Sequence, residues 1–542
     1  MNMKKIGLII AFSALVCSAW AVPARRGEIV KTQPDGTQIV VYQHGDEHFH
    51  WMTNEKGEWL KIDVDGFYRV TEALSAEQIE AKRMAAPSRA AQAATPLNIA
   101  PRGLVILVNF TDVAFETDKA EMDSMLMGKN YTRDYSYVYR LQTYEVHSEG
   151  SAWKYFYDVS SGQYNPQFDI VGPVTVSENM AYYGKNTAGF DAKPWTMIKE
   201  ACELVNDSID FTLYDNDNDG YVDFVYVIYA GYGEADGGDK NTIWPHSYWL
   251  TSAGTYCKVD GKQVDLYACG NELDYFSEKH TGIGTFCHEF SHVLGLPDMY
   301  ETTGNGTHKT LGAWSILDYG PYNNEGNTPP AYSAYERFFM GWLKPTLITD
   351  SAYLQLEELQ VSNTAFLISE TDEHNLIGND PKPTTFYLIE NRQQKGWDAY
   401  IPGHGMMLTK IRYSSNKWID NEVNNSSNRM GVDLIEADGK TPTLGKSGYD
   451  GKAGDLFPTG ATEYTGIIDH AIEAIAENAD IIAFSYKGGT AEPADANEPY
   501  IVEKVVAIYN ILGQKQAAVD IESLPHGTYV VVTTAGSKKI VR

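Results

Sequence analysis

The chain has 542 residues, too many for one hydrophobic core, so about three to four domains are expected. Hydrophobic residues make up 43% and aromatic residues 12% of the chain, a composition typical of folded, core-forming domains. The formal net charge of −29 argues against a nucleic-acid-binding protein, which needs a basic surface to neutralise phosphates. An acidic surface usually serves solubility, but some of its carboxylates can also hold cations.

The first residues predict a signal peptide. Two lysines precede the apolar run Ile6–Val16, and a small-x-small sequence of the kind that signal peptidase recognises ends at Ala21. The apolar run is shorter than the about 20 residues that a membrane-spanning helix needs. We therefore expect residues 1–21 to be removed from an exported protein that is secreted or associated with the cell surface.

Four cysteines remain beyond the signal peptide, and an exported compartment permits disulfides. Cys257 and Cys269 flank a turn signal, so a bridge across a hairpin is one of the three possible pairing schemes. Cys287 lies in a predicted helix and is more typical of a small buried apolar residue. The residues alone do not choose among the pairings.

Changes in composition along the chain predict the domain boundaries. Residues 22–98 hold a small β-meander over 28–72 and then an alanine-rich linker. Residues 99–345 open with a buried strand at "LVILVNF" and then alternate helices and strands. Residues 346–487 are predicted to be β-rich, and residues 488–542 are a second linker followed by a short β-type tail. The predicted fold class is therefore α+β.

An acidic loop, "DNDNDGYVD", resembles the start of a calcium-binding loop. Asp215, Asp217 and Asp219 alternate, Gly220 is the sixth residue, and Asp223 follows. Oxygen ligands at alternate positions around a sharp glycine turn are typical of EF-hand loops, although the twelfth position here is a tyrosine rather than a glutamate. A turn with solvated acids is the alternative. Because four aspartates in nine residues repel one another, we favour a bound calcium ion.

The sequence "GTFCHEFSHVLGLPDMY" predicts a metal-binding helix. Its apolar residues fall within one arc of about 120° on a helical wheel; they are Ile283, Phe286, Cys287, Phe290, Val293 and Leu294. His288 and His292, four residues apart, project together from the opposite face. Glu289 lies beside the position of the metal, where a general base for a metal-bound water is expected.

The residues after the helix predict the third metal ligand. Gly295 can end the helix in a left-handed conformation, and Pro297 prevents its continuation. Asp298 can then return beneath the metal, where a carboxylate oxygen is an ordinary zinc ligand. Two alternatives are a third ligand from further along the chain, such as Glu336, and a structural helix that carries two surface histidines and binds no metal.

The segment from about Pro101 to Lys344 resembles the M6, or immune inhibitor A-type, metallopeptidases, which are zinc proteases of the zincin class. The matching sequences occur in the order of the family; they are "LVILVNFTD", "SSGQYNPQFDIVGPVT", "YDNDNDGYVDFVYVIYAGYGEADGG", "IWPH", "GTFCHEFSHVLGLPDMY" and "GAWSILDYGPYNN". The resemblance implies a zincin-like catalytic domain, a twisted sheet plus an active-site helix, ahead of the β-rich domain. It also implies His288, His292 and Asp298 as zinc ligands.

The family pattern implies two further positions near the metal. A methionine that packs beneath the metal in related zincins is replaced here by Leu317. Because leucine and methionine have similar volumes, activity should survive the replacement. Tyr319 corresponds to a tyrosine that some related zincins use near the metal, so it is expected either to donate a hydrogen bond to the oxyanion or to be an ordinary packed tyrosine.

The resemblance extends to both ends of the chain. Residues 28–72 are similar to the segment that precedes such catalytic domains, which implies a propeptide; it contains no cysteine, so a thiolate on the zinc is excluded as the cause of latency. His48 and His50 in this segment could bind metal but are more often plain strand residues. The C-terminal stretch resembles the latter half of a type IX secretion sorting domain, which implies the secretion machinery as a partner.

Two functions from different classes are consistent with these features. The favoured function is a secreted zinc endopeptidase, made as a zymogen, that acts on protein or peptide substrates with Glu289 as the general base. The alternative is a surface-binding protein, an adhesin with a structural metal, whose function lies in residues 346–487. The residue that discriminates is Glu289, because a structural metal needs no base beside its histidines. Neither nucleic acid nor a transmembrane segment is expected.

Overall fold

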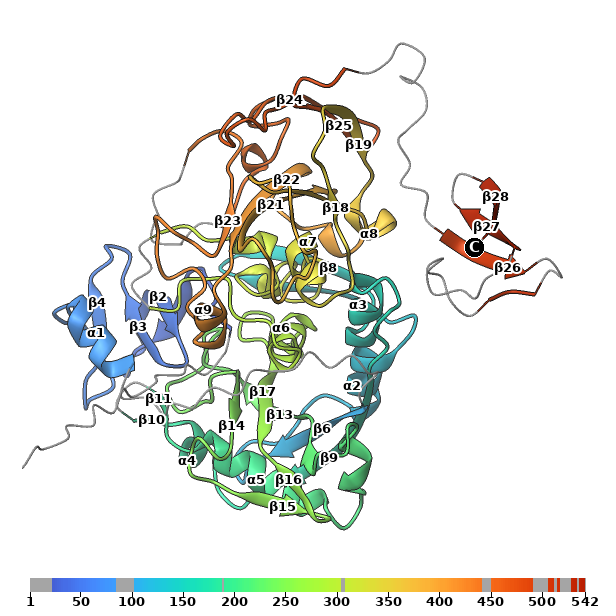
Figure 1. Cartoon of the computed structure of the whole chain (residues 1–542). Coiled ribbons are helices and arrows are strands. Elements are labelled where there is room, and N and C mark those ends of the chain that lie inside the picture. The colour runs from blue at the N-terminus through green and yellow to red at the C-terminus, as the bar shows by residue number, and fades with distance from the viewer. Residues whose placement is uncertain are drawn as a thin grey trace, which may run out of the picture.

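The computed structural model describes most of the chain (Figure 1). The described residues are 22–83, 102–187, 190–303, 308–440, 450–490, 505–510, 514–516, 528–533 and 536–541. The expected signal peptide and the two expected linkers, apart from their edges, lie outside these residues. Within the described part of the chain, none of the helices is both long and apolar enough to cross a membrane.

The N-terminal unit is an antiparallel sheet whose five strands follow one another in sequence order. Its elements are β1 (Ile29–Thr32), β2 (Gln38–Asp46), β3 (Phe49–Thr53), β4 (Trp59–Ile62), β5 (Tyr68–Val70) and α1 (Ala76–Arg83). A small core of Ile29, Val41 and Leu60 packs against Tyr275 and Phe276, which lie in the next unit. The N-terminal sheet is therefore docked on the rest of the molecule.

The next unit is built on a five-stranded sheet in the order β14-β17-β13-β6-β9, in which only β14 is antiparallel to its neighbour. The strands are β6 (Arg102–Asn109), β9 (Gln167–Thr175), β13 (Val225–Tyr232), β14 (His246–Trp249) and β17 (Leu266–Leu273). Along β6, Val105 and Leu107 enter one hydrophobic core, and the intervening Ile106 enters the other. The continuous apolar run is thus explained by burial on both faces.

Helices cover both faces of this sheet. On one face lie α2 (Lys119–Met127), α3 (Ala152–Val159) and α6 (Gly284–Val293), and on the other lie α4 (Met180–Gly184) and α5 (Pro194–Val205). The remaining elements are β7 (Thr132–Tyr139), β8 (Gln142–Glu149), β10 (Asn186–Thr187), β11 (Phe190–Asp191), η1 (Phe211–Tyr214), β12 (Tyr221–Val222), β15 (Cys257–Val259), β16 (Lys262–Val264), η2 (Gly312–Trp314), η3 (Gly320–Tyr322) and α7 (Ala334–Phe339). The fold mixes helices and strands, as the α+β prediction requires.

Residues 346–487 form two sheets, in the orders β18-β20-β21-β22-β23 and β19-β25-β24. The elements are β18 (Thr346–Leu347), β19 (Ala352–Leu356), α8 (Leu359–Ser362), β20 (Phe366–Ile368), β21 (Thr385–Arg392), η4 (Gly396–Asp398), β22 (Gly405–Arg412), α9 (Ser415–Ile419), β23 (Val432–Leu434), η5 (Ala453–Asp455), β24 (Ile472–Asn478) and β25 (Ile481–Tyr486). Side chains of the two sheets, among them Phe366 and Phe484, share one core. Here this part of the chain is called the β-rich unit.

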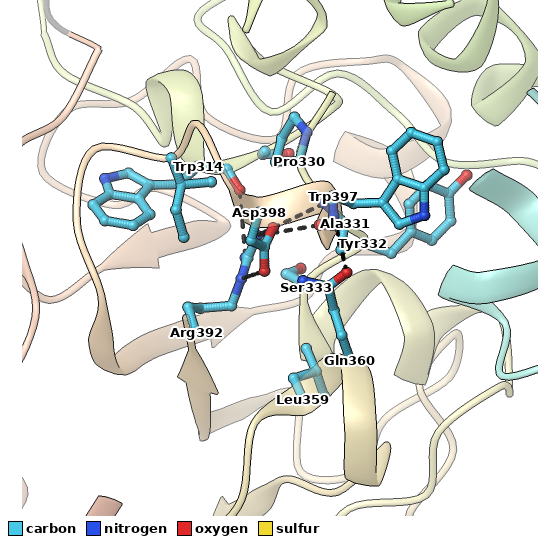
Figure 2. A network of polar contacts seen from close by, with 12 residues as sticks. Trp314, Pro330, Ala331, Tyr332, Ser333, Leu359, Gln360, Arg392, Trp397 and Asp398 are labelled. Carbon is cyan, nitrogen blue, oxygen red and sulfur yellow. Dashed lines mark hydrogen bonds and ion pairs between the residues drawn. The ribbon is translucent and has the colours of Figure 1, made fainter. Parts of the chain in front are cut away.

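The β-rich unit and the preceding unit share their largest core. One face of β21 and β22 packs into the same cluster of buried side chains as α6, so α6 lies between the two units (Figure 1). Figure 2 shows the polar contacts at this junction: the buried guanidinium of Arg392 bonds Asp398 (Nη2 to Oδ1, 2.6 Å), and the same oxygen accepts from the backbone N–H of Ala331 (2.9 Å). Arg392 also donates to the Ala331 carbonyl (3.3 Å).

The cysteines and the tail complete the description. Cys202, Cys257, Cys269 and Cys287 are all free and buried, so the Cys257–Cys269 bridge considered from the sequence is absent; the thiol of Cys257 instead contacts that of Cys202. The C-terminal strands β26 (Val505–Asn510), β27 (Thr528–Thr533) and β28 (Gly536–Val541) form an antiparallel sheet in sequence order. Its relation to a secretion sorting domain stays a prediction.

Candidate metal centre and active site

The helix α6 presents one face to the sheet and the opposite face to the site. The Phe286 ring lies 4.6 Å from that of Tyr226, and the Phe290 ring lies 4.9 Å from that of Phe224, both measured between ring centroids. After Val293 the chain turns through Gly295, whose φ of 94° is a left-handed conformation that favours glycine. The turn directs the following residues back toward the helix.

This arrangement brings His288, His292 and Asp298 together. The two Nε2 atoms lie 3.0 Å apart, and Asp298 Oδ1 lies 3.2 Å from the Nε2 of His288 and 3.3 Å from that of His292. All three side chains are fully buried. Bonds of about 2.0–2.2 Å in a tetrahedral zinc site separate the ligand atoms by roughly 3.3–3.6 Å, so the three atoms lie at or slightly below the spacing of such a site, and a small outward shift of the imidazoles would accommodate the ion.

The Nδ1 contacts of the two histidines determine which ring nitrogen can bind a cation. His288 Nδ1 faces the carbonyl oxygen of Ile316 (2.7 Å), and His292 Nδ1 faces that of Leu296 (2.8 Å). Because a carbonyl only accepts, each Nδ1 carries the proton and each neutral ring keeps a lone pair on Nε2. Burial also lowers the pKa of His288, which disfavours a second proton.

Asp298 supplies the negative charge of the site. Its Oδ2 accepts a hydrogen bond from Asn421 Nδ2 (2.7 Å), whereas its Oδ1 faces the two Nε2 atoms and has no hydrogen-bond partner among the described residues. Burial alone would raise the pKa of Asp298, but the neighbouring His292 and His288 hold it below its usual range. A buried anion with an unsatisfied oxygen beside two imidazole lone pairs is a donor set that could hold a zinc ion.

Glu289 lies next to the three ligands but does not join them. The carboxylate is buried; its Oε1 accepts the backbone N–H of Val22 (2.9 Å), and its Oε2 has no hydrogen-bond partner within the described residues. Burial first, and the charge of Asp298 second, raise its pKa well above the usual value. A carboxyl group with a raised pKa beside a metal site has the character of a general acid and base.

Residues 22–26, here called the N-terminal strap, run through the site. Besides the Val22–Glu289 bond, Trp244 Nε1 donates to the Val22 carbonyl (3.0 Å), and the Tyr322 hydroxyl donates to the Pro23 carbonyl (2.7 Å). Val22 is only 1% exposed. Nothing in the spacing of the sequence indicated that this segment reaches Glu289, because 267 residues separate the two.

Two arginines at the end of the strap fix it on both sides. Arg25 forms ion pairs with Asp274 and Glu325, and its guanidinium lies 4.3 Å from the centre of the Phe276 ring. Arg26 pairs with Asp450 and lies 3.3 Å above the Tyr319 ring. The strap is thus held by charge and by aromatic contacts as well as by backbone hydrogen bonds.

The turn between β2 and β3 is a second segment of the N-terminal unit that lies near the site. Glu47 in this turn is largely enclosed, with 9% of its side chain exposed, and the pKa of its carboxyl group is raised by burial, then by the charges of Asp46 and Asp298. His48 Nε2 contacts Glu47 Oε1 (3.1 Å), and His50 Nε2 contacts Glu234 Oε1 (3.1 Å). His48 and His50 therefore each contact a carboxylate, and neither belongs to the cluster of His288, His292 and Asp298.

Three further residues that the sequence analysis named are Leu317, Tyr319 and Glu336. The carbonyl of Leu317 accepts a hydrogen bond from the N–H of Met299 (2.7 Å), and the carbonyl of the preceding Ile316 faces His288 Nδ1. Leu317 therefore lies next to the segment that carries Asp298. Tyr319 carries the Arg26 guanidinium on its ring, and burial raises its pKa. Glu336 bonds Ser315 Oγ (2.7 Å) and the N–H of Ser333 (2.5 Å), so it caps α7 rather than serving as the third ligand.

The acidic loop brings three of its four aspartates together. Oxygens of Asp215, Asp217 and Asp219 lie within 4.8 Å of one another, around Gly220, whose φ is 94°. Asp223 turns away, and its Oδ2 accepts from the N–H (2.7 Å) and the side-chain amide (2.5 Å) of Asn216. The ammonium of Lys262 contacts Asp215 Oδ2 (2.5 Å) and neutralises part of the charge of the loop.

Part of the chain is similar to known peptidases. Residues 98–343 match the family model described as immune inhibitor A peptidase M6, catalytic domain. Immune inhibitor A of Bacillus thuringiensis subsp. alesti is 29% identical over 214 residues, and so is the pre-pro-metalloprotease PrtV of Vibrio cholerae. Each match covers 34% of this chain, but only 31% and 23% of the respective relative. Residues 98–343 therefore belong to the M6, immune inhibitor A, family of peptidases.

Proposed function

We propose that the protein is a secreted, zinc-dependent endopeptidase with a zincin-like catalytic domain. The observation that carries the proposal is the convergence of three buried ligand atoms, from His288, His292 and Asp298, beside the carboxylate of Glu289. Both relatives bear the names of peptidases or their family, which supports the same reaction class for this chain. The predicted signal peptide supports export.

The chain supplies the parts that peptide hydrolysis needs. A zinc ion bound to the three ligands would act as a Lewis acid toward a peptide carbonyl and would lower the pKa of water. Glu289 takes the proton from the attacking water and then gives it to the leaving amine. Burial, and then the charge of Asp298, raise the pKa of the Glu289 carboxyl, which makes the group a stronger proton acceptor than an exposed carboxylate. Tyr319 is a candidate to stabilise the oxyanion once Arg26 has left its ring.

We also propose that the described arrangement is a latent form, with the N-terminal unit as its propeptide. The strap binds the proposed general base, Glu289. While the Val22 N–H donates to Glu289 Oε1, that oxygen is not available to accept a proton from water. The name of the relative PrtV, a pre-pro-metalloprotease, agrees with synthesis as a precursor. Latency of this kind needs no thiolate on the metal.

Calcium at the loop Asp215–Asp219 is a further part of the proposal. Three carboxylates and a left-handed glycine make a suitable oxygen cage, and Asp223 is not in position to complete it in the described arrangement. The Lys262 ammonium would have to give up its contact with Asp215 when the ion binds. The ion would stabilise the connection into β13 rather than take part in the reaction.

The adhesin alternative is not favoured. A structural metal needs no carboxylate beside the histidines, yet Glu289 is buried there with a strongly raised pKa. A fully buried carboxyl with an unsatisfied oxygen is costly unless it has a role. The family of residues 98–343 is likewise named for peptidases.

Casein digestion tests the proposed function. Two forms are compared, the chain from residue 22 and the chain from residue 96, each with and without a zinc chelator. We expect the shorter form to digest casein, the longer form to be slower until the N-terminal unit is removed, and the chelator to abolish digestion. His288→Ala should be inactive, and His147→Ala, a change at an exposed histidine, should not. Chelator-resistant digestion that His288→Ala retains would contradict the proposal.

A further inference from the structure

The third ligand, Asp298, is held by a side chain from the β-rich unit. Asn421 Nδ2 donates to Asp298 Oδ2 (2.7 Å), and the backbone N–H of Asp298 donates back to Asn421 Oδ1 (2.8 Å). The orientation of the amide is unambiguous because a carboxylate only accepts and a backbone N–H only donates. We propose that Asn421 is the positioning residue of the metal centre, so that the β-rich unit completes the site; this inference rests on the proposed zinc site.

The paired bonds determine which oxygen of Asp298 faces the histidines. With Oδ2 bonded to Asn421, Oδ1 is the oxygen that lies 3.2 and 3.3 Å from the two Nε2 atoms. Asp298 lies in a loop, beyond Gly295 and Pro297, so no helix or strand orients its side chain. Hydrogen bonds around a metal ligand are what orient it in such a case.

The loop of residues 421–425 also forms hydrogen bonds with the residues that follow Asp298. Asn424 Nδ2 donates to the Met299 carbonyl (2.7 Å), and Asn425 Oδ1 accepts the N–H of Thr302 (2.8 Å). The Thr302 hydroxyl donates to the Asn421 carbonyl (2.7 Å). The whole stretch that carries the third ligand is therefore bonded to one loop of the β-rich unit.

That loop is itself anchored to the sheet of the β-rich unit. The side chain of Asn424 bonds both backbone groups of Val432, the first residue of β23, at 3.0 Å each. Strand β23 pairs with β22, whose side chains enter the core shared with α6. Asn421 itself is 1% exposed and has a φ of 55°, a left-handed conformation that asparagine tolerates. Asp298 is thus connected, through Asn421 and the loop that contains it, to a strand of the β-rich sheet.

Zinc affinity measures this role directly. The tests use the chain from residue 22 in the inactive Glu289→Ala background, and zinc affinity is measured by competition with a chelator. Asn421→Gly removes the side chain without straining the left-handed backbone. The matched control is Asn363→Gly, because Asn363 also lies in the β-rich unit, has a left-handed φ (50°) and makes two side-chain hydrogen bonds to the preceding unit, with Arg337 and Trp342.

We expect Asn421→Gly to bind zinc about 10- to 100-fold more weakly than its parent, as loss of a bond to a metal ligand does. Asn363→Gly should bind zinc within about twofold of the parent. The melting temperatures of the two zinc-free variants should be similar, which separates positioning from general stability. If Asn421→Gly does not fold, Asn421→Ser is measured against the same control.

The outcomes distinguish this inference from the proposed function. If the parent binds no zinc, or if His288→Ala binds it as the parent does, the proposed zinc site is wrong. If His288→Ala loses zinc but Asn421→Gly and Asn363→Gly bind it equally well, the zinc site stands and the role of Asn421 is overturned. A selective loss in Asn421→Gly supports both.

Discussion

At the scale of single residues, Glu289 is the group on which both the proposed reaction and the proposed latency depend. Its Oε1 holds the strap through Val22, and its raised pKa suits proton transfer. Glu289→Ala leaves all three ligands in place, so the variant should still fold and bind zinc. Peptidase activity should fall by several orders of magnitude, since positioned general bases contribute about 10²- to 10⁴-fold or more. Activity and zinc content of the same preparation are the measurements; digestion at the parental rate would exclude Glu289 as the base.

A second residue-scale prediction concerns the pH dependence of stability. Burial raises the pKa of Asp236 to about 7, the neighbouring Asp274 adds to the increase, and Arg25 opposes it. Between its ordinary value of 3.8 and about 7, the unfolded chain loses the proton while the folded chain keeps it, so the free energy of unfolding falls as pH rises through this window. Below the window both states are protonated, and above it the loss of stability is complete.

Asp236→Asn should remove this dependence, because the amide is neutral at every pH. In the Glu289→Ala background, we expect Asp236→Asn to melt at a higher temperature than the parent at pH 8 and at nearly the same temperature at pH 4. At pH 8 the free energy of unfolding of the variant should exceed that of the parent by on the order of 1–3 kcal/mol. The control is Asp63→Asn, since the Asp63 carboxylate is at the surface and its pKa is lowered by Arg69 and then Lys61. A gain of equal size at both pH values would mean that ionisation of Asp236 is not the cause.

At the scale of elements, the strap should be released when its arginines are removed. Arg25 lies partly buried between Asp274, Glu325 and the Phe276 ring, and removing its charge leaves both carboxylates without this partner. The Arg25→Ala and Arg26→Ala double variant of the chain from residue 22 should therefore digest casein sooner after purification than the parent. Arg69→Ala is the control, because Arg69 pairs only within the N-terminal unit, with Asp63 and Asp65. A double variant as latent as Arg69→Ala would show that the strap does not hold the site closed.

The acidic loop is the second element with a testable role. Calcium that binds only the folded form increases the free energy of unfolding by mass action, by about 2.7 kcal/mol at a concentration of 100 Kd. The melting temperature rises as a result. Millimolar calcium should therefore stabilise the Glu289→Ala protein, which cannot digest itself, and should not stabilise an Asp217→Ala and Asp219→Ala double variant. Both of these aspartates are exposed, so their removal leaves no buried partner unpaired. Equal melting temperatures with and without calcium in the Glu289→Ala protein would identify the loop as a solvated turn.

Some of these elements could be predicted from the sequence because their signal is local. The i, i+4 spacing of His288 and His292, opposite an apolar arc, depends only on helix geometry, and the apolar runs of β6 and β13 depend only on burial of both faces. Asn421 and Val22 could not be found in this way. They reach the site from 123 and 267 residues away, and no periodicity records which distant loop meets a helix end.

At the scale of the whole molecule, the β-rich unit is part of the metal centre's support. Composition placed a boundary near residue 345, because β-type patterns begin there, but hydrophobic patterning does not say which surface an apolar face will meet. In the structure Met407 and Ile411 of β22 enter the same core as Phe290 of α6. Arg392 and Asn421 add polar bonds across the same junction. The segment that matches the M6 family is thus packed on one side against residues outside the match.

The last prediction follows from this shared core. A chain that ends at residue 345 exposes the apolar face that β21 and β22 cover, leaves the Ala331 backbone without Asp398 and Arg392, and leaves Asp298 without Asn421. Residues 22–345 should therefore fail to fold cooperatively or bind zinc at least about tenfold more weakly than residues 22–542. A chain that ends at residue 490 should match the full chain in melting temperature and zinc affinity, because it keeps every one of these contacts. A single sharp melting transition and full zinc affinity in residues 22–345 would show instead that the catalytic unit is complete without the β-rich unit.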